Sequence, residues 1–375
     1  MSVHNHDELE VIGLVNHFPA AVGKAPSGID FDADYIRSSA HLQEAAGYDR
    51  VLIANAATMP ESFAISAYLA SSTTSLNFLM AHRPGVVPPT VAARHIATID
   101  RLSKGRCAVH IIAGADDREV QADGLFNTKD ERYLIAAEYV EVMRKMWSSE
   151  KPFDFDGEYY KFRGAFARVR PGNGAVPVYW AGTSDLALDL CGKCADVYAF
   201  GGDTFDRAAM LTGKARAAAA RYKREISVLM TIVVIASDSE DDAWERAASL
   251  YEKVVAQREN GDIGIVGDHE KAGDEAASGA FRRMLDQAKS GDRLDRCLWT
   301  GLNKAYMGRG NNSVLVGTPE QVVDSLMEYR RLGVDRFLLR GPDQDNDAGF
   351  IGEKVIPLLK QTIAETMQSV AANEN

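Results

Sequence analysis

The sequence predicts an α/β fold, a (β/α)8 TIM barrel with insertions. Eight apolar runs alternate with helical patterns along the 375 residues, at the spacing of a barrel. No Gly-x-Gly-x-x-Gly motif follows a predicted strand, which disfavours a doubly wound dinucleotide-binding sheet. In a barrel the carboxyl ends of the strands build the active site. The strand-end residues to consider are His17, Asn55, His82-Arg83, His110, Gly182-Thr183-Ser184, Gly201-Gly202 and Arg340.

The clearest single unit is residues 78–114. An apolar run at 76–80 stops at a basic, proline-rich corner, and a helical pattern from Thr90 to Leu102 ends at a glycine before a second apolar run. A strand, a helix and a strand in this order form a βαβ unit with parallel strands. His82 and His110 stand at the two strand ends, so we expect them at the same edge of the sheet.

The other elements follow from the same patterns. Strands are predicted at 10–15, 50–53, 107–112, 176–181, 195–200, 227–235 and 336–339. Further helices are predicted at 32–46, 60–71, 130–147, 185–193, 204–222, 237–258, 318–332 and 350–367. Two insertions interrupt this rhythm: a β-hairpin within about 151–173, and an irregular stretch at about 259–313 with one helix at 280–289. We expect the second insertion to be lid-like or partly disordered, and residues 1–375 to form a single domain.

Composition narrows the class of protein. A net charge of -11 argues against a nucleic-acid partner or an anionic membrane surface. No apolar run of 18 residues suggests a membrane span. The first ten residues are polar and acidic and lack the apolar region of a signal peptide, so we expect a cytoplasmic protein.

The cysteine and acidic clusters do not indicate a metal site. Cys191-Gly-Lys-Cys194 has the spacing of a redox pair, but a redox pair stands at a helix N-terminus, where the dipole lowers the thiol pKa. This pair lies near the end of a predicted helix, and no second Cys/His pair completes a zinc tetrad. We therefore interpret it as structural. Asp116, Asp117 and Glu119 are interpreted as solvated, because no histidine is correctly spaced.

Two short segments could bind a phosphate. Gly182-Thr183-Ser184 joins a strand to a helix N-terminus, where free backbone N–H groups and hydroxyls suit an anion; simple helix capping explains it equally well. Arg132 and Tyr133 begin the helix after the fourth strand and could reach the same phosphate, although a surface Arg and a core Tyr are the simpler interpretation. His82 and His110 could polarise or protonate a bound ring, and two histidines at one mouth favour this modestly over a structural role.

A longer pattern runs through nearly the whole chain in order. Its main block consists of Phe78-Leu79, Ala81, Arg83-Pro84, Pro89-Thr90-Val91-Ala92-Ala93-Arg94, Ala97-Thr98, Asp100-Arg101-Leu102-Ser103 and Gly105-Arg106. Supporting stretches are Glu131-Arg132-Tyr133, Gly182-Thr183-Ser184-Asp185, Asp241-Asp242-Ala243-Trp244, Leu315-Val316-Gly317 and Leu332-Gly333-Val334-Asp335. In these residues the chain resembles the bacterial luciferase-like flavin-dependent monooxygenases, most closely their alkanesulfonate monooxygenase branch.

The resemblance implies a barrel that binds reduced FMN (FMNH2), supplied by a separate NAD(P)H-dependent flavin reductase, and that uses O2 as co-substrate. Oxygen adds to the reduced flavin, and the resulting peroxyflavin attacks the substrate; in the sulfonate enzymes this releases sulfite and an aldehyde. The resemblance further implies that Tyr133 and Ser184 hold the phosphate with Arg132 close by, and that His110 and Glu119 line the flavin. His110 stands where many members have Asn. A homodimer or homotetramer is implied by analogy.

The same comparison shows departures that bear on the substrate. Met59 stands where the sulfonate enzymes have a Cys. Thr231 and Val233 stand where those enzymes have the Arg and His that hold sulfonate and peroxide. Pro342 falls near the position of an active-site Tyr. Arg309 lies within one position of the lid arginine. A sulfonate buried without donors would cost several kcal/mol. These departures resemble the branch that opens pyrimidine rings or acts on other uncharged heterocycles.

The chain is thus predicted to be a two-component FMNH2-dependent monooxygenase of a small organic substrate, an organosulfur or alkanesulfonate-like compound or a heterocycle. Catalytic candidates are His17, Asn55, His82 and Arg309; cofactor-binding candidates are His110, Glu119, Arg132, Tyr133, Gly182, Thr183 and Ser184. One alternative is a non-catalytic flavin-binding paralogue, which would bind FMN tightly without any substrate-dependent use of oxygen. The other is a deazaflavin-dependent dehydrogenase on the same barrel, which would depend only weakly on oxygen.

Overall fold

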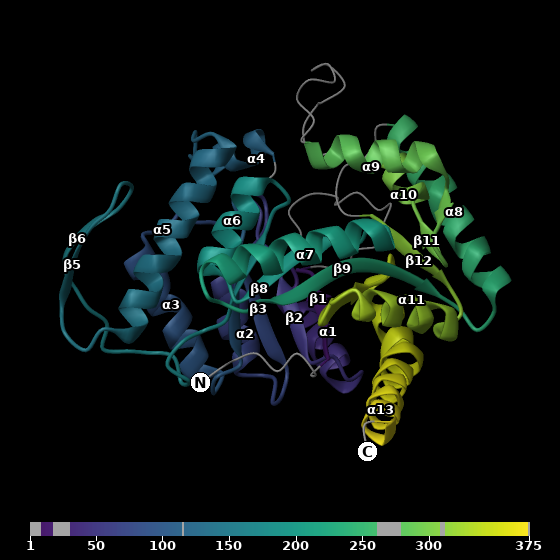
Figure 1. Ribbon diagram of the computed structural model, residues 1–375, viewed down its shortest axis with the longest axis horizontal. Helices are drawn as coiled ribbons and strands as arrows, with labels where there is room; N and C mark the ends of the chain where they lie inside the picture. The colour runs from purple at the N-terminus through teal and green to yellow at the C-terminus, as the bar shows by residue number, and fades with distance from the viewer. Residues whose placement is uncertain (1–8, 18–30, 115, 261–278, 308–311, 374–375) are drawn as a thin grey trace.

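The computed structural model describes residues 9–17, 31–114, 116–260, 279–307 and 312–373 (Figure 1). Parallel strands close into a barrel with helices around it, which confirms the predicted (β/α)8 architecture. The strands of the barrel, in spatial order, are β1 (Glu10–Val15), β2 (Arg50–Ile53), β3 (Asn77–His82), β4 (Cys107–Ile111), β7 (Val178–Ala181), β8 (Val197–Gly201), β9 (Ser227–Ala236) and β13 (Arg336–Arg340). The pairings of β9 with β8 and with β13, and of β13 with β1, complete the circle. Each predicted strand agrees with its observed bounds to within two residues.

The barrel interior is filled by side chains that alternate along each strand. Ile12, Leu79, Tyr179, Leu229 and Leu338 belong to one inner cluster, while the intervening residues of the same strands pack outward against the helices. This alternation assigns every further strand residue to one face or the other, because successive side chains of a strand point to opposite sides. It decides below which of the candidate residues can meet inside the barrel.

The amino-terminal end of the barrel is closed by a buried charge network. Glu10 accepts from Arg50 Nε at 2.8 Å, from Tyr179 Oη at 2.9 Å and from Arg336 Nη1. Burial raises the pKa of Glu10, but the charges of Arg50 and Arg336 outweigh it and lower the pKa to about 2. The carboxylate is therefore ionised at neutral pH. It lies at the opposite end of the strands from the candidate site.

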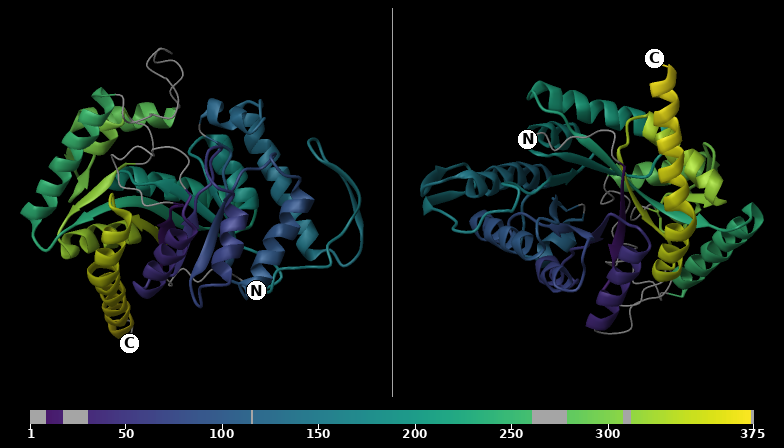
Figure 2. Two further views of the ribbon diagram at one scale, coloured as in Figure 1. Left: turned by 180° about the vertical axis from the view of Figure 1, so that it is seen from behind. Right: turned by 90° about the horizontal axis from the view of Figure 1, so that it is seen from below.

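The covering helices begin and end where the sequence indicates. They are α1 (Ala33–Ala45), α2 (Ser62–Ala70), α3 (Pro89–Leu102), α5 (Lys129–Ser148), α6 (Asp185–Cys194), α7 (Phe205–Arg221), α8 (Glu240–Glu259) and α11 (Pro319–Arg331). Thr128 and Thr318 form complete capping boxes with Glu131 and Gln321, which fixes the starts of α5 and α11. The last predicted helix starts earlier than expected: α12 (Gln344–Phe350) runs through a π-helical turn (Ile351–Val355) into α13 (Ile356–Asn373), which projects from the body of the molecule (Figure 2).

The segment at 259–313 is more regular than predicted. Its described part contains α9 (Gly279–Ser290), β10 (Arg293–Leu294), β11 (Leu298–Trp299) and α10 (Gly301–Ala305), followed by β12 (Val314–Gly317). The predicted helix at 280–289 is confirmed as α9, whereas β10, β11 and α10 were not predicted, because two-residue strands are too short to show a period of two. β12 pairs in parallel with the end of β9, so Val233 lies opposite both Arg340 and Val314. β9 is therefore shared by the barrel and by a small outer sheet.

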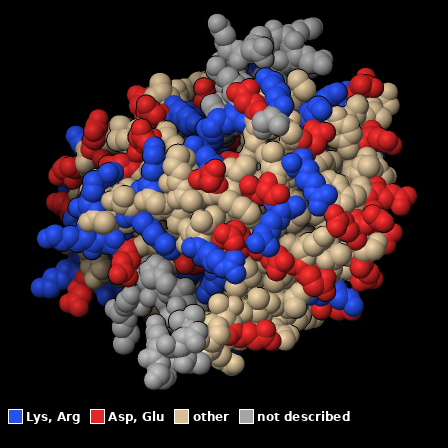
Figure 3. All heavy atoms as spheres, turned by 45° about the vertical axis from the view of Figure 1, so that its right-hand side comes forward, with Lys and Arg blue, Asp and Glu red and all other residues tan. Residues whose placement is uncertain are grey.

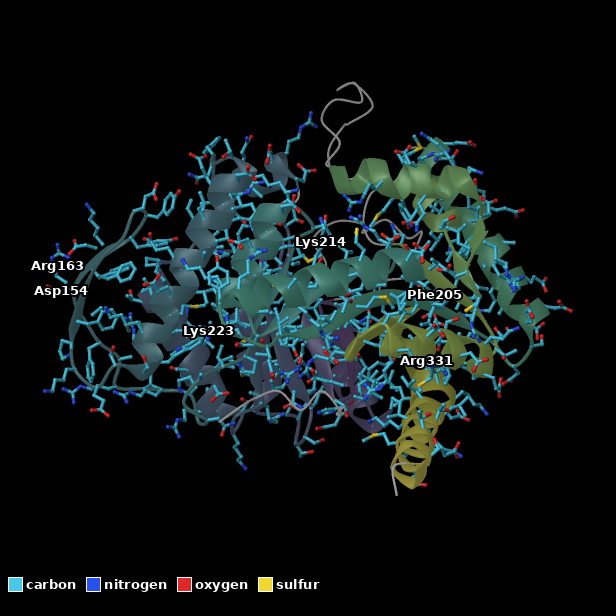
Figure 4. The ribbon with its side chains drawn as sticks, in the orientation of Figure 1. Asp154, Arg163, Phe205, Lys214, Lys223 and Arg331 are labelled. Atoms are coloured by element: carbon cyan, nitrogen blue, oxygen red, sulfur yellow. The ribbon has the colours of Figure 1, made fainter. Side chains whose placement is uncertain are left out.

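Two other connections carry structure of their own. A short helix, α4 (Asp117–Ala122), follows β4 where the sequence predicted a solvated loop. The predicted hairpin is confirmed: β5 (Phe153–Asp156) and β6 (Lys161–Ala165) pair antiparallel and extend outside α5, with Asp154 and Arg163 at the outer edge (Figure 4). The Glu138 carboxylate of α5 accepts the backbone N–H groups of residues 158, 159 and 160, which anchors the hairpin to the barrel.

No helix among the described residues is both long and apolar enough to cross a membrane. On the face shown in Figure 3, acidic and basic side chains are interspersed. The negative net charge therefore does not form a field of one sign over that face.

Candidate functional site

His110 faces the barrel interior near the carboxyl end of β4. It lies two residues after Ala108 of the inner cluster, and its ring meets the inward Tyr179 ring edge-on, with 6.4 Å between centroids. Burial lowers the pKa of His110 to about 4, so the imidazole is neutral at neutral pH. Its Nδ1 atom is buried and has no hydrogen-bond partner among the described residues. A buried orphan nitrogen pointing into a barrel mouth is a feature that a bound molecule can satisfy.

His82 does not join His110. In the parallel register His82 lies opposite Ile111, one residue out of phase with His110, so its side chain points outward. There it stacks on Phe63 at 4.9 Å between centroids and bonds the Tyr139 hydroxyl through Nε2 at 2.7 Å. Burial, with the nearby charges of His95 and Arg83, lowers its pKa to about 3. His82, a catalytic candidate from the sequence, thus lies between the sheet and its helices and does not face the barrel interior with His110.

The remaining catalytic candidates lie around β1 and β2. His17 and Met59 line a small hollow of about 20 Å³ together with Asn16 and Ala54, at the ends of these two strands. That volume corresponds to about one water molecule. Asn55 follows β2 and donates from Nδ2 to the Ala81 carbonyl at 3.3 Å. Arg309 lies outside the described residues.

The loop after β4 is held together by charged side chains. Arg132 donates to the carbonyl oxygens of Ala113, Asn127 and Gly114 at 2.7, 2.6 and 3.3 Å, and to the Asp117 carboxylate at 2.9 Å. Its guanidinium thus forms its hydrogen bonds with this loop and is not oriented toward Ser184. Asp117, interpreted from sequence as solvated, is its counter-ion.

Glu119 was also interpreted as solvated, yet it is engaged on both sides. Its carboxylate accepts the Ala57 N–H at 2.9 Å and pairs with the buried Arg83, which also pairs with Asp123. Glu119 therefore joins the loop after β2 to the loop after β4 at the rim of the barrel.

Tyr133, Gly182 and Ser184 form a tight cradle at the carboxyl end of β7. Gly182 has φ of +135°, and a Cβ at this position would collide with the Tyr133 hydroxyl and lie 2.7 Å from the Ala187 Cβ. Only glycine leaves the hydroxyl room to reach the backbone here. Ser184 caps α6, its side chain accepting the Ala187 N–H at 3.2 Å. Burial raises the pKa of Tyr133 to about 12, so its hydroxyl keeps its proton and can donate to an anion.

α9 contacts the residues that follow β7 and β8, next to the same cradle. Arg283 donates from Nη2 to the Thr183 hydroxyl at 3.3 Å, and Gln287 donates to the Asp203 carboxylate at 2.7 Å. The start of α7 is bound to the same insertion, since the Phe205 N–H donates to Asp295 at 2.9 Å. Figure 4 labels Phe205 at this helix. Sequence reasoning missed Arg283, because the segment around it shows no family pattern.

Comparison with known proteins decides the family. A family model described as luciferase-like monooxygenase matches residues 12–336. The chain belongs to the luciferase-like monooxygenase family. Among solved structures, riboflavin lyase (RcaE) with modified FMN and riboflavin aligns with a TM-score of 0.76 at 20% identity, covering 95% of this chain and 92% of that one.

Two further relatives widen the range of chemistry on this fold. EDTA monooxygenase (EmoA) from Chelativorans sp. BNC1 aligns with a TM-score of 0.75 at 20% identity, covering 95% and 94% of the two chains. An F420-dependent secondary alcohol dehydrogenase aligns with a TM-score of 0.67 at 17% identity, covering 94% and 99%. At these identities the likeness shows the shared fold alone.

In this luciferase-like barrel, Arg340 adds a cation to the mouth. Arg340 follows the inner-cluster residue Leu338 by two positions on β13, so it too faces inward, and it lies opposite Val233. Burial lowers its pKa, opposed by interaction with Tyr306 just after α10. Thr231, the other changed position on β9, lies opposite Leu338. Pro342 is buried and lines a separate cavity of about 590 Å³ between α8 and the loop after β13, which none of the predicted site residues touches.

The cysteines take no part in the site. Cys191 and Cys194 are buried on α6, and Cys194 donates its thiol hydrogen to the Leu190 carbonyl. Burial raises the pKa of Cys191 well above its usual value and that of Cys194 to about 12. Thiols that stay protonated are poor nucleophiles and poor metal ligands. The structural interpretation of this pair in the luciferase-like chain is therefore supported.

Proposed function

We propose that this protein is a flavin-dependent monooxygenase that uses FMNH2, delivered by a separate NAD(P)H-dependent flavin reductase, and O2 to oxidise a small organic substrate. The observation that carries the proposal is the pairing of an inward His110 with the cradle of Tyr133, Gly182 and Ser184 at one barrel mouth. His110 can form a hydrogen bond to a polar atom of a flavin ring, and the cradle can bind the phosphate of the cofactor. The family supplies the reaction class.

The residues fit flavin mononucleotide on three counts. The orphan Nδ1 of His110 leaves a polar contact for a ring bound in the interior. The Tyr133 hydroxyl and the α6 N-terminus offer donors to a phosphate. Glu119, fixed by Arg83 and the Ala57 N–H, joins the loops after β2 and β4 at the rim of the barrel. When bound, the reduced flavin supplies the electrons that activate oxygen.

The chain itself positions the cofactor and controls protons. His110 is neutral because it is buried, so it can donate or accept one proton at its ring nitrogens without carrying a fixed charge. Tyr133 and Ser184 fix the phosphate end, and thereby the depth of the ring in the barrel. α9, held by Thr183 and Asp203, covers the mouth on the β7–β8 side and limits access of water.

We further propose that the substrate is a small organosulfur compound, an alkanesulfonate-like molecule or a heterocycle, bound near Thr231, Val233 and Arg340. His17, Asn55 and Met59 follow β1 and β2, and β1 pairs with β13, which carries Arg340; in this proposal they complete the substrate pocket. The apolar Val233 favours an uncharged group, and Arg340 favours a polar or anionic one. A homodimer or homotetramer remains our expectation for the assembly.

The test is substrate-dependent incorporation of labelled oxygen from O2, with purified protein, a flavin reductase, NADH and FMN, over a panel of sulfonates, thioethers and heterocycles. We expect labelled product from at least one compound and none when the reductase or O2 is left out. Tight binding of FMN without product or oxygen use would favour the non-catalytic paralogue. Reduction of a deazaflavin that is indifferent to oxygen would favour the dehydrogenase, whose chemistry occurs on the same fold.

A further inference from the structure

The cavity of about 590 Å³ between α8 and the loop after β13 is large enough to hold a small molecule. One wall is a single face of α8 that includes Glu245, Ser249 and Lys253, which follow one another at intervals of one helical turn. Ile235, near the end of β9, and Pro342 line the cavity from the barrel side. None of the residues proposed for the flavin or the substrate lines it.

Hydrogen bonds hold the two sides of this cavity together. Arg246 of α8 donates to the Asp347 carboxylate at 2.6 Å and to the Ala236 carbonyl at 2.7 Å. The buried Asp347 carboxylate also accepts the Asp343 N–H at 2.8 Å, which binds the loop after β13 to the same point. The charge of Arg246 is thus paired within the protein. The cavity is preformed, and a preformed site loses little conformational entropy when a ligand binds.

Two charges of opposite sign on the α8 wall have no partner. Neither Glu245 nor Lys253 forms a hydrogen bond or an ion pair with another residue of the described part of the chain. The positions three and four residues before and after each of them hold no residue of opposite charge, so α8 itself offers no ion pair. The two residues are two turns apart, about 12 Å along the helix axis, with Ser249 midway.

The other lining residues indicate which kind of molecule this wall would bind. Asp242, one turn before Glu245, lines the same end and adds a second carboxylate there. Leu250 lies between Glu245 and Lys253 along the helix and adds apolar surface to the wall. A matching ligand has an ammonium group at the acidic end, a carboxylate at the Lys253 end and a short apolar chain between them. A ligand with one charge would match one end of the wall only.

We propose that this cavity is a second ligand site, separate from the barrel mouth, which binds a small zwitterion of the ω-amino acid type. Glu245 binds the ammonium group, Lys253 binds the carboxylate, and the chain between these groups lies along Ser249 and Leu250. The proposal goes beyond the proposed function and does not depend on it, because no flavin takes part in this contact.

Isothermal titration calorimetry of the full chain with a series of ω-amino acids, from glycine to ε-aminocaproate, tests this proposal. We expect affinity to rise with chain length, because the two protein charges stand two turns apart. Caproate and hexylamine, which each lack one charged group, should bind at least about threefold more weakly than ε-aminocaproate. Glu245→Gln and Lys253→Met should each weaken ε-aminocaproate binding by a similar factor. Ser249→Trp should abolish it by filling the space between the charges.

Glu252→Gln is the matched control, because Glu252 is an exposed carboxylate of the same helix that does not line the cavity. Its affinity for ε-aminocaproate should equal that of the wild type, and thermal unfolding of each variant shows that it is folded. The absence of binding to the wild type, equal affinity for the zwitterion and its single-charge analogues, or equal loss in the Glu245 and Glu252 variants would overturn the proposal.

A competition experiment separates this site from the mouth. Saturating FMN should leave the affinity for ε-aminocaproate unchanged, whereas displacement of ε-aminocaproate by FMN would place it in the mouth and overturn the second site. Failure of the protein to bind FMN would overturn the proposed function and leave the second site standing.

Discussion

Arg340 on β13 lies directly opposite Val233 on β9 in the hydrogen-bonded register of the barrel. In the sequence, Val233 replaces an anion-binding residue of the sulfonate enzymes. This replacement alone predicts an apolar face on β9. The structure brings an inward guanidinium to the same level from the neighbouring strand. The mouth therefore keeps a cation, displaced by one strand around the barrel.

The first prediction concerns substrate charge. Replacement of Arg340 by Met should weaken binding of methanesulfonate, titrated against the FMN complex by difference spectroscopy, by about tenfold, because a charged donor is lost. Binding of an uncharged thioether should be unaffected. Arg331→Met is the control, since Arg331 is exposed on α11 (Figure 4) and pairs only with Glu328 on the surface. Equal loss for both ligands would show that Arg340 acts on packing instead.

The second prediction is a loss of stability in mild acid. His82 and His110 have pKa values of about 3 and about 4 in the folded protein, below the ordinary value of 6.5. Between pH 6.5 and 4 the unfolded chain binds protons that the folded chain does not, so stability falls as pH falls, by up to about 1.4 kcal/mol per pH unit for each histidine. Urea unfolding between pH 7 and 4.5 measures this slope.

His82→Gln separates the two histidines. It should remove about half of that slope while keeping a polar group beside the Tyr139 hydroxyl. Glu10 does not contribute in this window, because its pKa of about 2 means that its stabilisation is present above pH 4.5 and lost only below it. An unchanged dependence of stability on pH in the His82 variant would contradict the low pKa assigned to His82.

The third prediction tests the cradle. Gly182→Ala should abolish detectable FMN binding and destabilise the fold by about 1–3 kcal/mol, because the added Cβ meets the Tyr133 hydroxyl at a φ that L-residues rarely adopt. Gly174→Ala is the control: it also has a positive φ, of +84°, but open space where its Cβ would lie. Its loss of stability should come without loss of FMN binding. Fluorescence quenching and thermal unfolding report the two effects separately.

The fourth prediction tests the closed end of the barrel. Glu10→Gln leaves Arg50 and Arg336 without a counter-ion and should cost about 3–5 kcal/mol of unfolding free energy in urea. Asp34→Asn, which breaks an exposed pair with Arg37, should cost less than about 1 kcal/mol. FMN affinity should survive in both, since neither residue lies near the mouth. A Glu10 variant as stable as the wild type would show that the arginines find other partners.

The barrel could be predicted because its strands are buried on both faces and appear as continuous apolar runs between helices with clear caps. What could not be predicted is the face on which a side chain lies. His82 and His110 look equivalent in sequence, yet one residue of phase places them on opposite sides of the sheet. The same limit applies to Arg132, whose acceptors are backbone carbonyls of a loop that no pattern specifies.

The residues of the cradle could be found in the sequence where a local motif exists and could not be found where none exists. Gly182 to Ser184 follow a strand and precede a helix, and this position can be predicted from the sequence. Arg283 comes from a distant segment, and its approach to Thr183 depends on how the insertion folds back over the barrel. Long-range contacts of this kind have no sequence period.

The forked pairing of β9 has a consequence for protein engineering. Because residues 233–236 of β9 align β12, the covering segment is registered against the barrel by a strand that the barrel itself needs. A chimera that exchanges only residues 259–313 with another family member would keep β9 and β12 but pair a foreign β11 with the native β12. The exchangeable unit is instead the block from Ser227 to Gly317, which carries its own alignment strand with it.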